Sequence, residues 1–123
     1  MAVIGRTESD NLLVTYAHPA AVGSVTVAGL AEAKTYKRGT VLARNASNKF
    51  VIASGAANTS AEVILAADAE IGTADTEAEV FVSGDFFEQG LTLGEGHDLT
   101  EADRVSLKNA GIYIVDGMAA HPL

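Results

Sequence analysis

Turn-forming residues recur along most of this chain, at intervals of 8 to 12 residues from Thr35 onward. Gly, Asn, Asp and Ser dominate these sites because they adopt or stabilise the backbone conformations that tight turns require. The segments between them have the length of β-strands and are too short for a series of helices. The sequence therefore predicts a compact, β-rich α/β domain, a small barrel or sheet. The turn sites are Arg38–Gly39, Asn45–Asn48, Ser54–Asn58, Gly72–Asp75, Ser83–Gly84, Gly90 and Gly94–Gly96.

Two apolar segments between these turns predict strands of different burial. Residues 62–67 read EVILAA, a continuous apolar run of strand length, which is typical of a strand buried on both faces. Residues 77–82 read EAEVFV, in which acidic and apolar residues alternate before Phe81 breaks the pattern. That alternation predicts a strand covered on one face only.

One short helix is predicted near the C-terminus, over Glu101–Ala110. Thr100 is a favourable N-cap, Asp103 stands at the N3 position of a capping box, and Gly111 follows as a left-handed C-terminal cap. A helix of this length is marginal alone and needs to dock on the sheet. The sequence then returns to a strand at IYIV, residues 112–115.

The apolar residues of this helix predict which of its faces docks. At 100° per residue an apolar stripe forms on one side, with Leu107 at its margin and charged residues opposite. We therefore expect Val105 to pack inward, so that a charge placed there would destabilise the fold. The stripe consists of Leu99, Ala102, Val105 and Ala110.

Composition excludes several classes of protein. The chain has 123 residues and 48% hydrophobic content, which fits one folded domain with an appended arm. It has no cysteine, so disulfides and thiolate metal sites are ruled out. We predict no membrane partner, because no apolar run approaches the length of a span and the N-terminus lacks the pattern of a signal peptide. A net charge of -8 argues against a nucleic-acid partner.

Charge is distributed unevenly. Five of the eight basic residues fall between Lys34 and Lys49, whereas twelve of the sixteen acids lie between Phe50 and Asp103, where there is no basic residue. The simpler interpretation is a solvated acidic face that maintains solubility. The alternative is that the basic segment of one subunit meets the acidic segment of another, or of a host shell.

No group of residues carries the pattern of a catalytic, cofactor or metal site. His18, His97 and His121 are far apart and lack the spacing of metal ligands, so we interpret them as exposed loop histidines. The oxygens of Asp98–Asp103 lack the order of a calcium loop and fit helix capping better. We predict that the chain is not an enzyme, and that its phenylalanines at 81, 86 and 87 serve the core.

The first 30 residues differ from the rest of the chain. Met1–Asn11 shows neither helical nor strand periodicity, and residues 17–29 are rich in small residues. We therefore predict a flexible N-terminal arm over residues 1–30 and a β-rich domain over residues 31–123. The valines at 22, 25 and 27 indicate a second strand there. We expect removal of Met1–Val22 to leave a folded domain.

A series of segments gives the chain a family resemblance. In order they are GTVL (39–42), KFVIA (49–53), EVILAAD (62–68), EVFVSGDFFEQGLTL (79–93) and TEADRVSLKNAGIYIV (100–115). Together they resemble the head decoration proteins of tailed bacteriophages, of the lambda decoration-protein type.

The resemblance implies a structural protein of the virion, made in the host cytoplasm. Such proteins bind as trimers to the outer surface of the expanded head and stabilise it, and their N-terminal arm adds a strand to the major capsid protein. The matching arm residues here are Leu12, Leu13, Val14, Thr15 and Tyr16. The alternatives are a carbohydrate- or receptor-binding module on a small acidic β-barrel, and another structural protein of a virion or oligomer.

Overall fold

The computed structural model describes residues 12–14 and 19–115, and it is mostly β-sheet. Among these residues there are nine strands, one short 3-10 helix and one α-helix. The strands are β1 (Leu13–Val14), β2 (Ala21–Val27), β3 (Lys34–Tyr36), β4 (Val41–Arg44), β5 (Phe50–Ile52), β6 (Ser60–Leu65), β7 (Ala69–Ile71), β8 (Thr76–Phe87) and β9 (Ile112–Val115). The 3-10 helix is η1 (Glu88–Gly90) and the α-helix is α2 (Glu101–Ala110).

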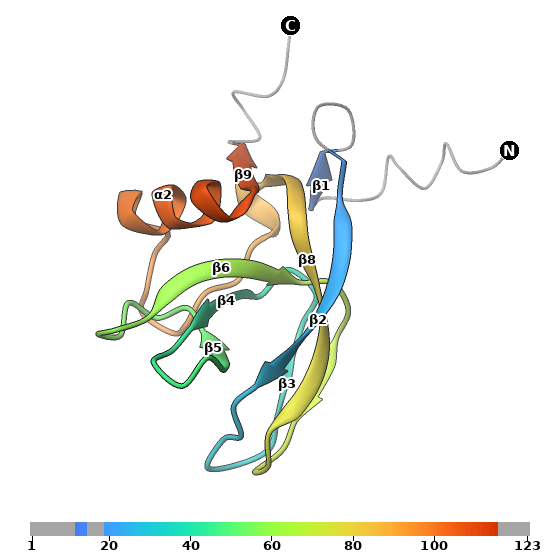
Figure 1. Ribbon diagram of the computed structural model, residues 1–123, viewed down its shortest axis with the longest axis vertical. Coiled ribbons are helices and arrows are strands. Elements are labelled where there is room, and N and C mark those ends of the chain that lie inside the picture. The colour runs from blue at the N-terminus through green and yellow to red at the C-terminus, as the bar shows by residue number, and fades with distance from the viewer. Residues whose placement is uncertain (1–11, 15–18, 116–123) are drawn as a thin grey trace, which may run out of the picture.

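Five strands close a barrel in the order β8-β2-β5-β4-β6, with β6 pairing back to β8 (Figure 1). Strand β8 runs for 12 residues and extends beyond the barrel, where it pairs with β1 and β9. Strands β3 and β7 form a separate two-stranded sheet. The predicted β-rich α/β domain with one helix near its C-terminus is therefore confirmed.

Apolar side chains fill two cores on opposite faces of the barrel strands. Ile64 belongs to the core beneath α2, together with Phe81, Phe86 and Leu107. Its neighbours Val63 and Leu65 belong to the second core. Side chains alternate between the faces of a strand, so a strand between two cores has to be apolar at successive positions. The prediction that this run is buried on both faces is confirmed.

The predicted alternation along residues 77–82 is also present in β8. Ala78 and Val80 are buried in the second core, whereas Glu79 is exposed. The alternation ends at Phe81, which is buried in the core beneath α2. Its ring packs against that of Phe86 with 5.2 Å between centroids. Both phenylalanines are therefore core residues, as predicted, whereas Phe87 is half-buried and belongs to neither core.

The ends of α2 follow the predicted capping pattern. The Asp103 backbone N–H donates to the Thr100 hydroxyl over 3.1 Å, and the Thr100 N–H donates to the Asp103 carboxylate over 3.1 Å. Gly111 ends the helix with φ of 103°, a left-handed conformation in which a side chain would be strained. Because these interactions are local, they could be predicted from the sequence.

The prediction of which face of α2 packs against the sheet is wrong. Val105 is 48% exposed, whereas Leu107 is fully buried, and the Ser106 hydroxyl donates to the Ala61 carbonyl over 2.7 Å. Positions 105 and 107 lie about 200° apart around a helix, so only one can face the sheet. Leucine has the larger apolar side chain, and Ser106 beside it loses little on burial because its hydroxyl is hydrogen bonded.

The folded body begins earlier than the predicted boundary at residue 30. Leu12 is buried in the core beneath α2, and β1 pairs with β8 through Leu13 and Phe86. Strand β2 pairs with β8 along its whole length, and Val27 is buried in the second core. Removing residues 1–22 would delete part of this structure, so we no longer expect that truncation to leave the domain intact.

Candidate functional site

Opposite charges pair within the chain. The basic segment between Lys34 and Lys49 lies against acids of the second half, with N–O distances of 3.5 Å for Lys37–Asp68, 3.1 Å for Arg44–Glu62 and 2.6 Å for Lys49–Asp75. These side chains are between 27% and 73% exposed, so solvent screens each pair and it stabilises the fold only weakly. The two charge segments that the sequence indicated thus meet inside one subunit, and these contacts give no reason to invoke a second subunit.

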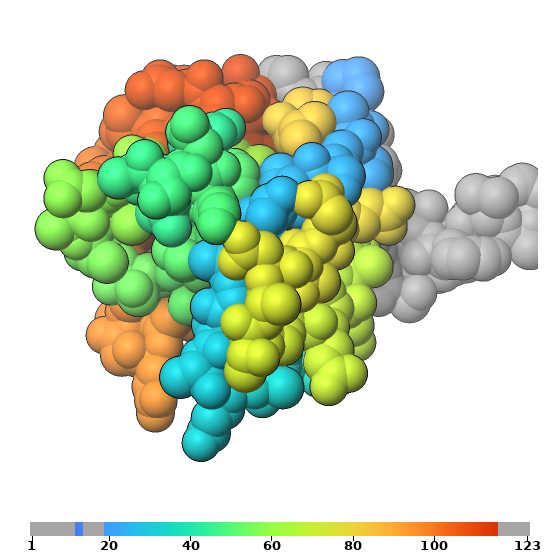
Figure 2. Space-filling model, turned by 60° about the horizontal axis from the view of Figure 1, so that its bottom comes forward, coloured from blue at the N-terminus to red at the C-terminus, as the bar shows by residue number. Residues whose placement is uncertain are grey.

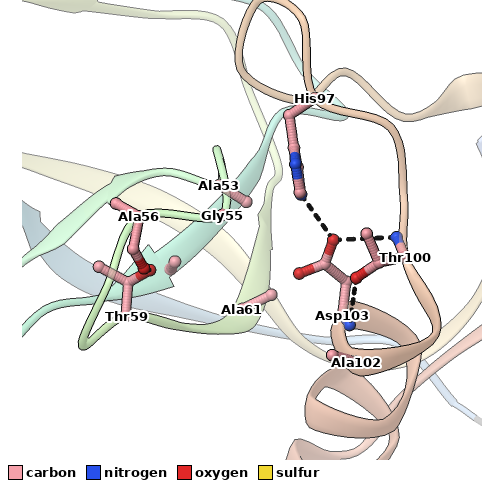
Figure 3. A pocket seen from close by; sticks show the side chains of 10 residues that line it. Ala53, Gly55, Ala56, Thr59, Ala61, His97, Thr100, Ala102 and Asp103 are labelled. Carbon is pink, nitrogen blue, oxygen red and sulfur yellow. Dashed lines mark hydrogen bonds and ion pairs between the residues drawn. The ribbon is translucent and has the colours of Figure 1, made fainter.

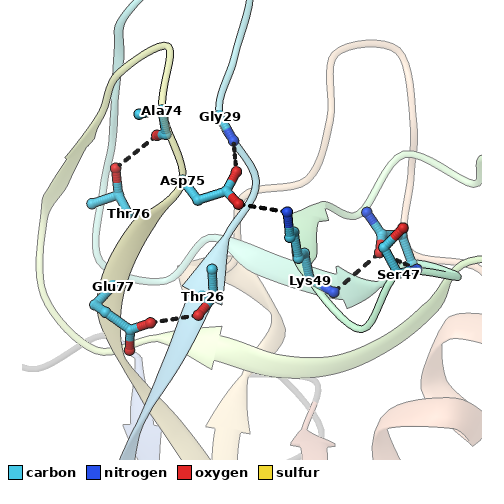
Figure 4. A network of polar contacts seen from close by, with 9 residues as sticks. Thr26, Gly29, Ser47, Lys49, Ala74, Asp75, Thr76 and Glu77 are labelled. Atoms are coloured by element: carbon cyan, nitrogen blue, oxygen red, sulfur yellow. Dashed lines mark hydrogen bonds and ion pairs between the residues drawn. The ribbon is translucent and has the colours of Figure 1, made fainter.

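One group of these charges organises the turns at the end of the β2–β8 ribbon (Figure 4). The Asp75 carboxylate accepts from the Gly29 N–H over 3.0 Å as well as pairing with Lys49. Lys49, followed by the Gly29 N–H, holds the pKa of Asp75 below its ordinary value. The Glu77 carboxylate accepts from the hydroxyls of Thr26 and Ser24, which lower its pKa likewise. All these acceptors have donors from the chain itself, which indicates a structural network.

A second polar pair joins the loop before α2 to the helix. His97 Nε2 lies 2.8 Å from the Asp103 carboxylate, and the two side chains are only 16% and 15% exposed. Burial is the largest influence on Asp103 and opposes its ionisation, but hydrogen bonds from the Thr100 N–H and His97 outweigh it and lower the pKa. The prediction that His97 is an exposed loop histidine is therefore wrong. His18 and His121 lie outside the described residues.

The His97–Asp103 pair borders a pocket of about 330 Å³ between the N-terminus of α2, strands β4 and β6, and the connection from β5 to β6 (Figure 3). Small side chains create the space, since Ala43, Ala53 and Ala61 are buried where larger residues would fill it. The rest of the lining comes from Gly55, Ala56, Thr59, His97, Thr100, Ala102 and Asp103.

The polar side chains that line this pocket are engaged with one another or with the backbone. Its His97 ring is engaged with Asp103, the Thr59 hydroxyl donates to the Ala56 carbonyl over 2.6 Å, and the Thr100 hydroxyl caps the helix. Among the residues that the structure describes, no cluster of three or more His, Asp or Glu side chains could hold a metal ion. The arrangement therefore serves to position the loop against the helix.

Comparison with known proteins identifies the family of this chain. The family model for bacteriophage lambda head decoration protein D matches residues 1–112, which is most of the chain. The chain belongs to this family. No curated protein sequence matches it significantly. Membership makes it a structural protein of the phage head, and the sequence resemblance to decoration proteins is confirmed.

A decoration protein acts through its surface, so its functional residues are those that can meet the capsid. Of the predicted arm residues, Leu12 is buried in the core and Leu13–Val14 form β1 beside β8. Thr15 and Tyr16 lie outside the described residues. The structure thus places the first part of the predicted capsid-binding segment at the margin of the decoration protein's own sheet.

Sequence reasoning missed the large apolar residues that the decoration protein exposes. Among the described residues these are Val22 at 54%, Val82 at 37% and Val105 at 48% exposure. Val82 is left without a partner by a register shift in the β2–β8 pairing, which local sequence does not reveal. Exposed apolar side chains that lie close together mark contact surfaces more often than isolated ones do.

No described helix has the length and apolar character needed to cross a membrane.

Proposed function

We propose that this decoration protein binds as a homotrimer to the outer surface of the expanded phage head and stabilises the shell. The observation that carries the proposal is the family match, which extends from residue 1 through the barrel and α2. A cysteine-free chain of 12.6 kDa has a small core and no covalent cross-links. Burial between subunits and against the shell would add stability that such a core lacks.

The proposed contact with the major capsid protein is strand addition by the N-terminal segment that includes Leu12–Tyr16. Its described part, β1, already has extended backbone and pairs with β8 in an antiparallel register. Strand addition uses main-chain hydrogen bonds, so it makes little demand on side chains. Three such segments on one trimer would act together through their effective concentration, so each contact can be weak.

The test is co-sedimentation of the purified protein with expanded, undecorated heads of the phage that encodes it. We expect the full chain to sediment with the heads and to raise their melting temperature, and light scattering to give the mass of a trimer. A chain lacking Met1–Asn11 keeps Leu12 and both N-terminal strands, so it should remain folded yet bind more weakly. Equal binding by that chain would refute a contribution from Met1–Asn11 and confine the proposed contact to Leu12–Tyr16, and no binding by the full chain would refute decoration itself.

A further inference from the structure

The barrel has one weak seam, between β2 and β5. Val27 opposite Phe50 is the single residue pair in their register, supported by the Ala28 N–H donating to the Phe50 carbonyl over 2.9 Å. The other barrel strands are joined by two or more residue pairs. From Ala21 to Thr26, the edge of β2 that faces away from β8 therefore has no partner strand among the described residues. In Figure 2, β2 (blue) lies on the surface between β8 (yellow) and the β4–β5 turn (green).

This edge lacks three of the features that keep edge strands from pairing with other chains. Natural edge strands are protected by charged residues, by proline or by very short length. Strand β2 has seven residues, reads AVGSVTV, and contains no charge and no proline. Two of the exposed large apolar side chains, Val22 and Val82, also lie at this end of the β2–β8 ribbon. The edge thus has the composition of a strand that accepts another strand.

The charges beside this edge indicate what kind of strand it accepts. On β8, Glu79 lies opposite Ser24, is exposed, and its carboxylate has no partner among the described residues. Glu77 lies two residues away on the same face, where it accepts from Ser24 and Thr26. A second copy docked edge to edge would supply no positive charge here, because β2 and β8 contain no basic residue. The favoured occupant is therefore a different protein that supplies a positive charge.

The spacing between strands restricts which side chain can supply that positive charge. A strand added beside β2 would lie two strand spacings from β8, or roughly 10 Å. Ser24 between them is small, so a long side chain on the added strand can pass over it. Lysine and arginine have that length and carry their charge at the tip. A short cationic group would not reach Glu79.

We propose that the edge of β2 from Ala21 to Thr26 is a docking site for an extended segment of the major capsid protein that carries a lysine or arginine opposite Glu79. The inference rests on the proposed function, because it identifies a second contact on the same partner. It differs from the N-terminal contact in that here the decoration protein offers the strand edge and the capsid protein supplies the added strand.

A charge reversal tests whether a positive charge of the capsid protein meets Glu79. Glu79→Lys is compared with Glu70→Lys, which changes another exposed glutamate, on β7 of the separate sheet. Binding of each full-length variant to expanded, undecorated heads is measured by co-sedimentation over a range of protein concentrations. We expect Glu79→Lys to weaken binding about tenfold, a loss of about 1.4 kcal/mol, and Glu70→Lys to bind like the unmodified chain. Equal affinities for both variants would overturn the predicted positive charge.

A pair of proline variants tests whether the added strand binds through backbone hydrogen bonds to β2. In a strand, adjacent N–H groups point to opposite sides, so Gly23 and Ser24 direct one towards β8 and the other towards the open edge. Gly23→Pro and Ser24→Pro each remove one of these N–H groups. The variant that loses the N–H towards β8 should melt at a lower temperature, whereas the one that loses the outward N–H should keep its melting temperature. This second variant should lose most of its binding to heads. Retained binding by that variant would overturn the docking site.

If both proline variants unfold, hydrogen exchange on the unmodified chain still tests docking at β2. Amides of Ala21–Thr26 in the unmodified chain should exchange more slowly on heads than in free protein. Unchanged exchange with the chain bound to heads would overturn docking at β2 while leaving decoration intact. If the unmodified chain fails to bind heads, both this inference and the proposed function fall.

Discussion

Truncation of Leu107 tests how α2 is attached to the barrel. Leu107 is the buried residue of this helix and is fully inaccessible, in a core that includes Phe81, Phe86 and Ile112. Leu107→Ala removes three carbon atoms, worth roughly 2.4 kcal/mol of lost transfer free energy at about 0.8 kcal/mol each. The cavity left behind adds to this, so we expect a total loss of about 3–5 kcal/mol in the free energy of unfolding.

Val105→Ala provides the matched control, since it lies on the same helix with a side chain 48% exposed. We expect it to change the free energy of unfolding by less than about 0.5 kcal/mol. Urea unfolding followed by circular dichroism measures both variants, at a protein concentration where each shows one oligomeric species. The reasoning would be refuted if Val105→Ala destabilised the chain more than Leu107→Ala, because the helix would then dock by the opposite face.

Three further changes probe the ends of α2 and the loop before it. Asp103→Ala should lower the free energy of unfolding by about 1–2 kcal/mol, because it removes the capping interaction and the partner of His97. Since the folded pKa of Asp103 is lowered, its stabilisation is present above the unfolded pKa of about 3.9 and is lost as pH falls through the folded pKa. Urea midpoints of the two chains should therefore converge in acid, and a constant gap would contradict this account. Gly111→Ala should cost about 1–2 kcal/mol, because the residue has φ of 103°, and a thermal melt like that of the unmodified chain would show that the cap tolerates a side chain. Gly55→Ala should displace His97, because the added carbon would lie 2.9 Å from its ring; unchanged histidine NMR shifts would argue against that contact.

Features fixed by neighbouring residues could be predicted from the sequence. The ends of α2 depend on Thr100, Asp103 and Gly111, which lie within one turn of the helix termini. The apolar run of β6 depends on burial of successive side chains, which requires only that both faces be covered. In these cases local propensity and the tertiary fold agree, so the pattern and the structure coincide.

Features decided by distant contacts could not be predicted in the same way. The docking face of α2 depends on Ala61 of β6, which accepts from Ser106, and β2 belongs to the domain because of its pairing with β8. The pocket at the helix N-terminus exists because buried alanines from separate segments lie side by side, with Ala43 of β4 paired to Ala61 of β6. The pairing of His97 with Asp103 also needs the loop to fold back over the capping box. Sequence spacing alone does not report such juxtapositions.

Strand β8 has a consequence for how the chain is made. It pairs with β1, β2, β6 and β9, and the two N-terminal strands among these are synthesised long before it. Pairings between residues so far apart in sequence form slowly, since a long loop has to close first. Until Thr76–Phe87 has left the ribosome, β2 has no β8 to pair with. Uncharged strands that are exposed in this way are prone to aggregate. Yield during expression should therefore depend on temperature and synthesis rate more steeply than the final stability of the barrel would suggest.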